Sequence, residues 1–395
     1  MPEAVVVSAC RTAIATAFKG RLAHTSAFEL GHVIVEASLK RSGLSAEDID
    51  DVILGEGMYG GGDIARHAAV TNGMPHLPGV AVNRHCASSL TAVAMAAGSV
   101  RAGMEEAIIA GGVESRSTAP LARWRTPGTQ EWTDPWMPPT HPDRPDAPNQ
   151  DMSITVGWNT AQIAGVSREE MDAWALRSHR KAIEAIDAGR FADEIVPVQA
   201  LLPDGGRVDF TVDEHPRRDT SMERLAALKP LHPEIPGFSI TAGNSSGIND
   251  AAAALTVTSD RLAAERGLTP LAVIRSWASV GVDPAETGLA PTKAIPKALG
   301  RAGLSLQDVG LFEINEAFAA MCVATVRSLG IDPDIVNVSG SGCGLGHPVS
   351  ATGARMLTTL IHEMRRRGGG IAVASMCAGG GMGAAVVVEV PAPGA

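Results

Sequence analysis

Residues 44–52 read Leu-Ser-Ala-Glu-Asp-Ile-Asp-Asp-Val, and residues 304–312 read Leu-Ser-Leu-Gln-Asp-Val-Gly-Leu-Phe. The two stretches share one pattern of polar and apolar positions at an offset of 260 residues. At almost the same offset, 261, Cys86 corresponds to His347, and a helical pattern and then a glycine-ended apolar run follow each of them. Chance similarity between α/β segments is the alternative, but order and spacing agree across three features. The sequence therefore predicts a duplicated half.

Short apolar runs rich in branched residues recur along the chain, and glycines follow several of them. They lie at residues 4–9, 52–54, 107–110, 371–375 and 384–390. Such runs are typical of strands buried on both faces. Patterns with a helical period lie between them, for example Leu90, Val93 and Ala97, or Leu357, Leu360 and Ile361. Strands alternating with helices predict an α/β protein.

A long segment of the first copy has no counterpart in the second, and we interpret it as an inserted loop domain. We expect it at residues 120–246, between a first part of the N-terminal half (1–119) and its end (247–268), with the C-terminal half at 269–395. Its Trp- and Pro-rich beginning lacks periodicity and predicts an ordered, irregular loop. Ser167 and Glu170 form a capping-box signature for a helix that runs to Gly189.

The composition limits the class of protein. Of the 395 residues, 45% are hydrophobic and 19% are charged, which is typical of a compact soluble chain. The net charge of −10 argues against a surface that coats nucleic acid. Five scattered cysteines without a Cys-x-x-Cys pair support neither a disulfide framework nor a metal site, so we expect the cytoplasm. No basic targeting region and no apolar run near the roughly 18 residues of a membrane span are present, so no membrane contact is expected.

Cys86 lies in Asn-Arg-His-Cys-Ala-Ser-Ser-Leu at residues 83–90, directly before a helical pattern. A helix N-terminus favours an anion, so we expect a lowered thiol pKa and a thiolate nucleophile near neutral pH. A buried cysteine acting as a small apolar side chain is the alternative, and by residue type alone it is the commoner case.

His347 ends the glycine-rich stretch 339–347 and precedes Pro348, which we expect to be the first residue of the next helix. A rigid turn of this kind presents the imidazole as a base or as a hydrogen-bond donor. A structural histidine that caps the turn is an equally good interpretation. Cys343 with His347 would be too few ligands for a metal.

Cys377 follows a buried strand and precedes Ala-Gly-Gly-Gly at residues 378–381, where backbone N–H groups can converge on an oxyanion. An ordinary glycine-rich hairpin is the alternative. Asn315 and Glu316 follow another apolar run, and a polar pair at the end of a buried strand needs partners.

These four motifs, in this order, resemble the thiolase family. The resemblance runs from Val5 to Val390 and includes residues 111–115 (Gly-Gly-Val-Glu-Ser) and 241–250 (Thr-Ala-Gly-Asn-Ser-Ser-Gly-Ile-Asn-Asp). It implies a duplicated, five-layered α-β-α-β-α fold with an inserted loop domain. It also implies an acyl-CoA C-acyltransferase that works by a ping-pong mechanism, in thiolysis of 3-ketoacyl-CoA or in the reverse Claisen condensation.

The resemblance assigns roles to particular residues. Cys86 would accept the acyl group, Cys377 would be the acid and base at the substrate Cα, and His347 would activate Cys86 and donate to the thioester oxyanion. Asn315 would hold a water in that oxyanion hole. The N–H groups of Cys86 and Gly379 would form a second hole.

Coenzyme A thioesters would be substrates, with no tightly bound cofactor. Coenzyme A would lie on the loop domain, with Ser246 and Ala242 along the pantetheine and Arg217 near the nucleotide phosphate. The resemblance further implies a homodimer or a homotetramer.

The sequence departs from the family pattern where the substrate would be read. Ser-Gly-Cys-Gly-Leu stands at residues 341–345, Cys-Ala-Ser-Ser at 86–89, and Gly157-Trp158 replaces the usual Glu-Asn. Four of the six tryptophans, Trp124, Trp132, Trp136 and Trp158, lie within 35 positions of the loop domain. They could line a remodelled acyl pocket, which we favour, or merely anchor a loop.

Three other classes of protein are alternatives. A decarboxylating ketoacyl synthase shares the architecture and a nucleophilic cysteine, but it would not need Cys377. A non-catalytic CoA-binding relative would lack one of the four groups. A structural or interaction protein is disfavoured by the glycine-rich corners.

Overall fold

The structure is a computed structural model that describes residues 2–57, 59, 63–134 and 138–392. Its main strands form two half-sheets joined edge to edge by the pairs Val5–Val273 and Val6–Ala272. The first half-sheet contains, in spatial order, β4 (Val80–Val82), β3 (Asp51–Gly55), β5 (Ala107–Glu114), β9 (Asn249–Ser259) and β1 (Ala4–Thr12). The second continues with β10 (Ala272–Gly281), β13 (Met382–Val390), β12 (Gly370–Ala378) and β11 (Val309–Ile314).

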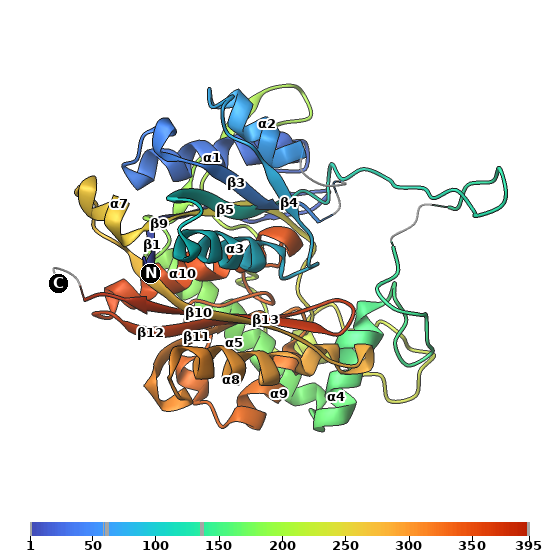
Figure 1. Ribbon diagram of the computed structural model, residues 1–395. Coiled ribbons are helices and arrows are strands. Elements are labelled where there is room, and N and C mark those ends of the chain that lie inside the picture. The colour runs from blue at the N-terminus through green and yellow to red at the C-terminus, as the bar shows by residue number, and fades with distance from the viewer. Residues whose placement is uncertain (1, 58, 60–62, 135–137, 393–395) are drawn as a thin grey trace.

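Helices lie on both faces of each half-sheet and complete five layers, α-β-α-β-α (Figure 1). The first outer layer consists of α1 (Ala27–Ser42) and α2 (Asp63–Thr71). The middle layer consists of α3 (Ser88–Ala102) and α10 (Thr352–Arg366), and the other outer layer contains α8 (Pro291–Ala302) and α9 (Ala319–Leu329). The predicted fold class is confirmed.

The two half-sheets repeat one topology. In the first, β3 is parallel to β4 and β5, while β9 is antiparallel to β5 and β1. In the second, β11 is parallel to β12, while β13 is antiparallel to β12 and β10. A parallel bridge from Phe312 to Val336 takes the place of β4. Even the capping boxes that precede β3 and β11 repeat, at Ser45–Asp48 and Ser305–Asp308. The duplication predicted from residues 44–52 and 304–312 is therefore present in the structure.

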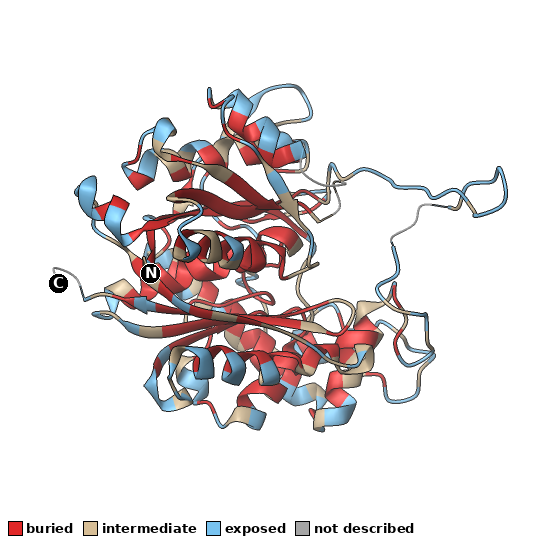
Figure 2. Ribbon diagram, in the orientation of Figure 1, coloured by how far each residue is buried: buried red, intermediate tan, exposed pale blue. Residues whose placement is uncertain are grey.

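The middle layer is packed on all sides, which explains its composition. Nine of the fifteen residues of α3 are buried, and most of them are alanine, serine or valine, as expected for a helix between two sheets. Gly353 of α10 approaches Leu90 of α3 so closely that a Cβ would lie 2.4 Å from the Leu90 nitrogen. Most of α10 and of both sheets is coloured as buried in Figure 2. The two helix N-termini are thereby fixed against each other.

The connection from β5 to β9 contains the large insertion, whereas β12 reaches β13 through residues 379–381 alone. The insertion holds the π-helical segment η2 (Ser153–Trp158), α4 (Asn159–Ala164), α5 (Arg168–Asp187), β6 (Ile195–Val196), β7 (Val198–Leu201), β8 (Arg207–Phe210) and α6 (Met222–Ala226). The capping box of Ser167 and Glu170 begins α5 as predicted, and the helix ends two residues before Gly189. The remaining short elements are β2 (Ala15–Thr16), η1 (Ala46–Asp48), α7 (Asp260–Glu265), η3 (Pro284–Leu289), η4 (Leu306–Asp308), η5 (Pro333–Ile335) and η6 (Val349–Ala351).

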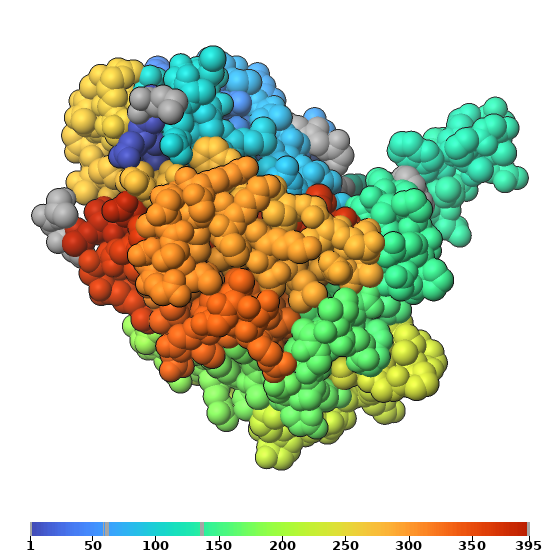
Figure 3. All heavy atoms as spheres, turned by 60° about the horizontal axis from the view of Figure 1, so that its bottom comes forward, coloured from blue at the N-terminus to red at the C-terminus, as the bar shows by residue number. Residues whose placement is uncertain are grey.

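The beginning of the insertion leaves the body of the molecule as an extended arm (Figures 1 and 3). Its described residues between Glu114 and Asp151 form no helix or strand, in agreement with the predicted irregular loop. Trp124 and Trp132 lie on this arm and are both 56% exposed. Their exposure does not support the interpretation that we favoured, in which these rings line the acyl pocket. Trp136 lies outside the described residues. No helix in the described part of the chain is long and apolar enough to span a membrane.

Candidate active site

Cys86 lies at the corner between β4 and α3, two residues before the helix begins. The preceding residue, His85, has a left-handed backbone with φ of 48°, a conformation that costs a non-glycine residue about 1–2 kcal/mol. Ser88 secures this turn, because its Oγ donates to the His85 carbonyl at 2.6 Å and accepts from the Arg84 N–H at 2.9 Å. The strained turn presents Cys86, which is half-buried, to the space between the two half-sheets.

The expected lowering of the Cys86 pKa is wrong. Burial, together with a smaller contribution from the nearby Glu114 carboxyl, raises the pKa of the Cys86 thiol to about 11. The backbone N–H groups of Gly379 and of Cys86 itself point at the sulfur and lower the pKa, but by less. Desolvation of the thiolate in this packed corner outweighs the helix N-terminus, so the resting group is a thiol.

His347 lies at the equivalent corner of the second half. Its N–H donates to Asn249 Oδ1 at 2.9 Å, and a parallel bridge joins it to Ile248 at the start of β9. Gly346 has a φ of 105° and packs on the Asn249 side chain, where a Cβ would lie 2.6 Å from Oδ1. Only glycine fits this position, so the turn before His347 has little freedom.

The hydrogen bonds of Thr352 fix the tautomer of His347. Thr352 Oγ1 donates to the Pro348 carbonyl at 2.7 Å, so it must accept from His347 Nδ1–H, also at 2.7 Å. His347 Nε2 is then the nitrogen that carries the ring lone pair, and the Asn315 amide nitrogen lies 3.4 Å from it. Burial, and after it the Arg355 guanidinium, lower the pKa of His347 to about 3. The ring is therefore neutral at physiological pH and can accept a proton at Nε2.

Pro348 is not the first residue of the next helix, contrary to the prediction. It caps the short 3₁₀ turn η6, with a ψ of 96°, and α10 begins only at Thr352. This extra turn is what lets the Thr352 hydroxyl reach both the Pro348 carbonyl and the His347 ring.

Cys377 is the second-last residue of β12 and is 2% exposed. Its sulfur lies 3.6 Å from Met321 Sδ and interacts electrostatically with Cys86. Burial, and after it Cys86, raise the pKa of the Cys377 thiol far above its ordinary value. Gly379, two residues on, supplies the N–H group that faces Cys86. The two thiols and this N–H group thus share one corner.

Asn315 directly follows β11 and is fully buried. Its N–H donates to the Ser375 carbonyl at 3.0 Å, which ties it to β12 two residues before Cys377. Asn315 Nδ2 lies 3.4 Å from His347 Nε2, and Oδ1 has no hydrogen-bond partner among the described residues. A buried amide oxygen without a partner is suited to hold a water.

Of the three predicted CoA contacts, Ser246 is tied to the other site residues. Its N–H donates to the Ala317 carbonyl at 2.9 Å, in the turn that follows Asn315. Ala242 is exposed on the same loop. Arg217 is exposed elsewhere in the insertion, where its N–H donates to His179 Nδ1 at 3.2 Å.

Glu316 is a site residue whose partners the sequence did not reveal. Its fully buried carboxylate accepts from Trp174 Nε1 (2.9 Å), Asn337 Nδ2 (2.7 Å), Ser178 Oγ (2.5 Å) and the Cys343 N–H (3.0 Å). It thereby fastens α5 of the insertion to the loops of Asn315 and His347. Cys343 is buried in this network, and burial raises the pKa of its thiol well above the ordinary value, which favours a structural role.

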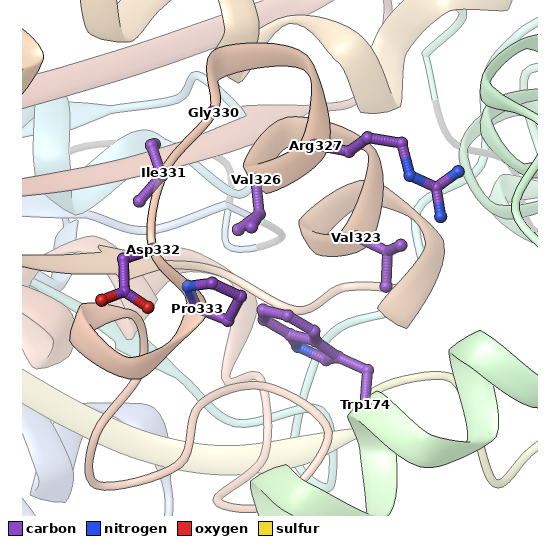
Figure 4. Close-up of a pocket in the computed structure, with 8 residues that line it drawn as sticks. All are labelled: Trp174, Val323, Val326, Arg327, Gly330, Ile331, Asp332 and Pro333. Atoms are coloured by element: carbon purple, nitrogen blue, oxygen red, sulfur yellow. The ribbon is translucent and has the colours of Figure 1, made fainter.

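A hollow of about 510 Å³ lies beside Trp174 (Figure 4). The end of α9 and the segment from Gly330 to Pro333 form its other walls. The predicted catalytic residues do not line it.

Comparisons with known proteins identify the family of this chain. The family model "Thiolase, N-terminal domain" matches residues 4–261, and "Thiolase, C-terminal domain" matches residues 268–390. The chain belongs to the thiolase family. An acetyl-CoA acetyltransferase of Escherichia coli (strain K12) is 41% identical over 403 residues, covering 98% of this chain and 99% of that protein.

Other members of the thiolase family match over similar lengths. A 3-ketoacyl-CoA thiolase of Bacillus subtilis (strain 168) is 41% identical over 98% of this chain and all of that protein. The crystal structure of the Bacillus anthracis acetyl-CoA acetyltransferase superimposes with a TM-score of 0.91 at 38% identity, covering 99% of both chains. These relatives carry two different names, so similarity alone does not choose between their substrates.

Proposed function

We propose that this chain transfers an acyl group between a 3-ketoacyl-CoA and coenzyme A by a ping-pong mechanism through a thioester on Cys86. The chain is an acyl-CoA C-acyltransferase by family. One observation supports the assignment to Cys86 above all: the N–H groups of Cys86 and Gly379 both point at its sulfur, with Cys377 beside it. An acyl group on this sulfur would place its carbonyl oxygen where two N–H groups can stabilise an oxyanion.

In the first half-reaction, Cys86 Sγ attacks the 3-keto carbonyl while its proton passes to His347 Nε2. Because the resting pair is a thiol and a neutral imidazole, the proton moves together with the attack rather than before it. The Cα–Cβ bond then breaks, and Cys377 donates its thiol proton to the Cα carbon that becomes the methyl group of acetyl-CoA.

The negative charge that develops on the thioester oxygen of the leaving enolate needs its own donors. His347, which then carries a proton on Nε2, and a water on Asn315 would supply them. The 3.4 Å separation of Asn315 Nδ2 and His347 Nε2 supports a shared oxyanion hole. In the second half-reaction the thiol of coenzyme A gives its proton to the Cys377 thiolate and attacks the thioester carbonyl. Cys86 then leaves and takes the proton back from His347 Nε2, so that all three groups return to their resting state.

Coenzyme A thioesters are the substrates of the thiolase family, and we assign no tightly bound cofactor to this chain. We place coenzyme A on an inserted loop domain at residues 120–246, with the pantetheine along Ser246 and Ala242 and the nucleotide near Arg217. We also propose that residues 1–119 and 247–268 form the N-terminal half and that residues 269–395 form the C-terminal half. The chain would form a homodimer or a homotetramer and would act in the cytoplasm.

A decarboxylating ketoacyl synthase is not favoured, because Cys377 lies beside Cys86 and such an enzyme would not need it. A non-catalytic CoA-binding protein is not favoured either, since all four groups are present. Cys377 lies beside Cys86, and the Asn315 amide lies 3.4 Å from the His347 ring.

The decisive experiment is incubation with acetyl-CoA followed by peptide mass spectrometry. We expect one acetyl group, on Cys86. An acetyl group on Cys377 or Cys343 in its place would contradict the assignment.

A further inference from the structure

Glu114, the last residue of β5, has no role in the mechanism above. It is fully buried in the corner that contains Cys86, and the two groups interact electrostatically. A buried carboxyl group is costly unless hydrogen bonds compensate for the lost water. Its position therefore needs an explanation.

The duplicated topology shows which residue Glu114 matches in the second half. Gly55, the last residue of β3, pairs with Gly112 of β5, and Ile314, the last residue of β11, pairs with Ser375 of β12. Glu114 lies two residues after Gly112 on β5, and Cys377 lies two residues after Ser375 on β12. Glu114 thus occupies in the first half-sheet the place that Cys377, our proposed Cα acid and base, occupies in the second.

The contacts of Glu114 lead to the turn of His347. Glu114 Oε2 accepts from the Ser350 N–H at 3.0 Å, in the 3₁₀ turn that immediately follows His347-Pro348. Glu114 Oε1 has no hydrogen-bond partner among the described residues. The Ser350 bond therefore joins the end of a first-half strand directly to the turn that carries the second-half base.

Close backbone approaches surround this bond. A Cβ on Gly112 would lie 2.1 Å from the Ser350 carbonyl oxygen, and a Cβ on Gly55 would lie 2.9 Å from the same atom. On the neighbouring helices, Ser89 Oγ accepts from the Ala354 N–H at 3.0 Å. Glycines thus let the His347 turn sit on the ends of β3 and β5, and Glu114 is the carboxyl group that holds it there.

We propose that Glu114 is a positioning residue that fixes the His347 turn against the Cys86 corner through its hydrogen bond to the Ser350 N–H. This proposal rests on the proposed function, because it concerns the geometry of proton transfer from Cys86 to His347. Burial raises the pKa of Glu114, so an uncharged acceptor of the same shape should serve as well as the carboxylate. In this proposal, Glu114 contacts neither the substrate nor the proton that passes from Cys86 to His347.

The test compares Glu114→Gln, Glu114→Ala and Glu114→Asp in the full chain. The measured quantities are the rate of Cys86 acetylation by saturating acetyl-CoA, the KM for acetyl-CoA and the melting temperature. Glu194→Gln is the matched control, because Glu194 is also fully buried and also has one oxygen without a partner, but it pairs with Arg11. It should lower the melting temperature and leave the acetylation rate unchanged.

We expect Glu114→Ala to slow acetylation by about 10- to 100-fold with KM within about threefold, because misplacement of a catalytic group by about 1 Å can cost about 100-fold. Glu114→Gln keeps an acceptor in place and should stay within about threefold of wild type. Glu114→Asp, which is one methylene shorter, should be slow like the alanine variant. If Glu114→Ala does not fold, the comparison of Gln with Asp decides.

Two results would overturn the inference: acetylation by Glu114→Ala at the wild-type rate, or equal losses in the Gln and Ala variants. If Glu114→Ala does not fold, equal rates in the Gln and Asp variants would overturn it as well. Failure of the proposed function looks different, because the wild-type chain itself would then not acquire an acetyl group on Cys86.

Discussion

The amino-terminal and carboxyl-terminal halves order their strands identically, yet their matching corners carry different side chains. Cys86 precedes the middle-layer helix of the first half, and His347 precedes that of the second. Glu114 at the end of β5 corresponds to Cys377 in β12. Glu56, which follows β3, corresponds to Asn315, which follows β11.

The comparison shows what a duplicated fold can keep and what it can change. Strand pairing and helix packing depend on backbone hydrogen bonds and apolar patterning, so both halves retain them. The residues just beyond the strand ends and before the helices are free to differ. In the proposed mechanism, one half therefore supplies the nucleophile, and the other supplies the base, a second thiol and an amide.

The largest effects are expected when each of the two thiols is removed in turn, because the comparison assigns them different roles. Cys86→Ala should lose acyl transfer by roughly 10⁴ or more, because the covalent route disappears. Cys377→Ala should still acquire an acetyl group on Cys86, but it should lose exchange of the acetyl-CoA methyl protons with deuterated water by about 10²–10⁴. Proton NMR follows the exchange. Cys10→Ala removes a buried thiol of β1 and is the control with normal activity; wild-type exchange in Cys377→Ala would refute its role as the base.

A second prediction concerns Asn315 and His347, which lie on neighbouring elements of the second half. Asn315→Ala should reduce turnover by roughly 10²–10³, the usual loss for one oxyanion donor, and His347→Ala by at least as much. Because both groups would act on the same oxygen, the double variant should lose less than the product of the single losses. Steady-state thiolysis rates of the four proteins give the cycle. Fully multiplicative losses would mean that the two residues act separately.

The third prediction concerns how the alkylation rates of Cys86 and Cys377 depend on pH. Since burial raises the pKa of Cys86 to about 11, its thiolate fraction is small at pH 7 and grows as protons are removed. Alkylation of Cys86 by iodoacetamide should therefore rise about tenfold per pH unit from pH 7 to 10. Cys377, whose thiol pKa lies higher still, should remain unlabelled throughout. Peptide mapping separates the two sites, and a plateau of Cys86 labelling below pH 8 would contradict the raised pKa.

The smallest expected effect belongs to Trp158 in the insertion, which only the first half has. Its ring stacks on Phe238 with 5.1 Å between centroids, and the adjacent Gly157 packs on Phe318 of the turn after Asn315. If the indole walls the acyl channel, Trp158→Ala should change kcat/KM by about 1 kcal/mol, roughly fivefold, for each methylene of a 3-ketoacyl-CoA series. Trp158→Phe keeps a ring and is the control. An equal loss at every length, together with a lower melting temperature, would leave only an anchoring role.

Several features were predictable from the sequence because each depends on neighbours along the chain. The repeat at residues 44–52 and 304–312 predicted the duplication, and the Ser167–Glu170 capping box predicted the start of α5. The motifs around Cys86, Asn315, His347 and Cys377 were recognisable because strand ends and helix starts have local signatures. The structure places Cys377 beside Cys86 and the Asn315 amide beside the His347 ring.

The properties that the sequence missed arise from residues far apart in the chain. The Cys86 pKa rises rather than falls because packing around the corner removes water, and no local pattern reports that. Likewise, Glu114 meets Ser350 across 236 positions, and the four partners of Glu316 come from three segments.

The sequence by itself thus determined the family, the repeated topology and the residues that we propose as reactive groups, since periodicity, caps and motifs are written in consecutive residues. Only the tertiary structure decided the protonation of those groups, the tautomer of His347 and the exposure of Trp124 and Trp132. Desolvation and hydrogen-bond direction depend on everything that surrounds a group, and those surroundings exist only once the two halves and the insertion are packed together.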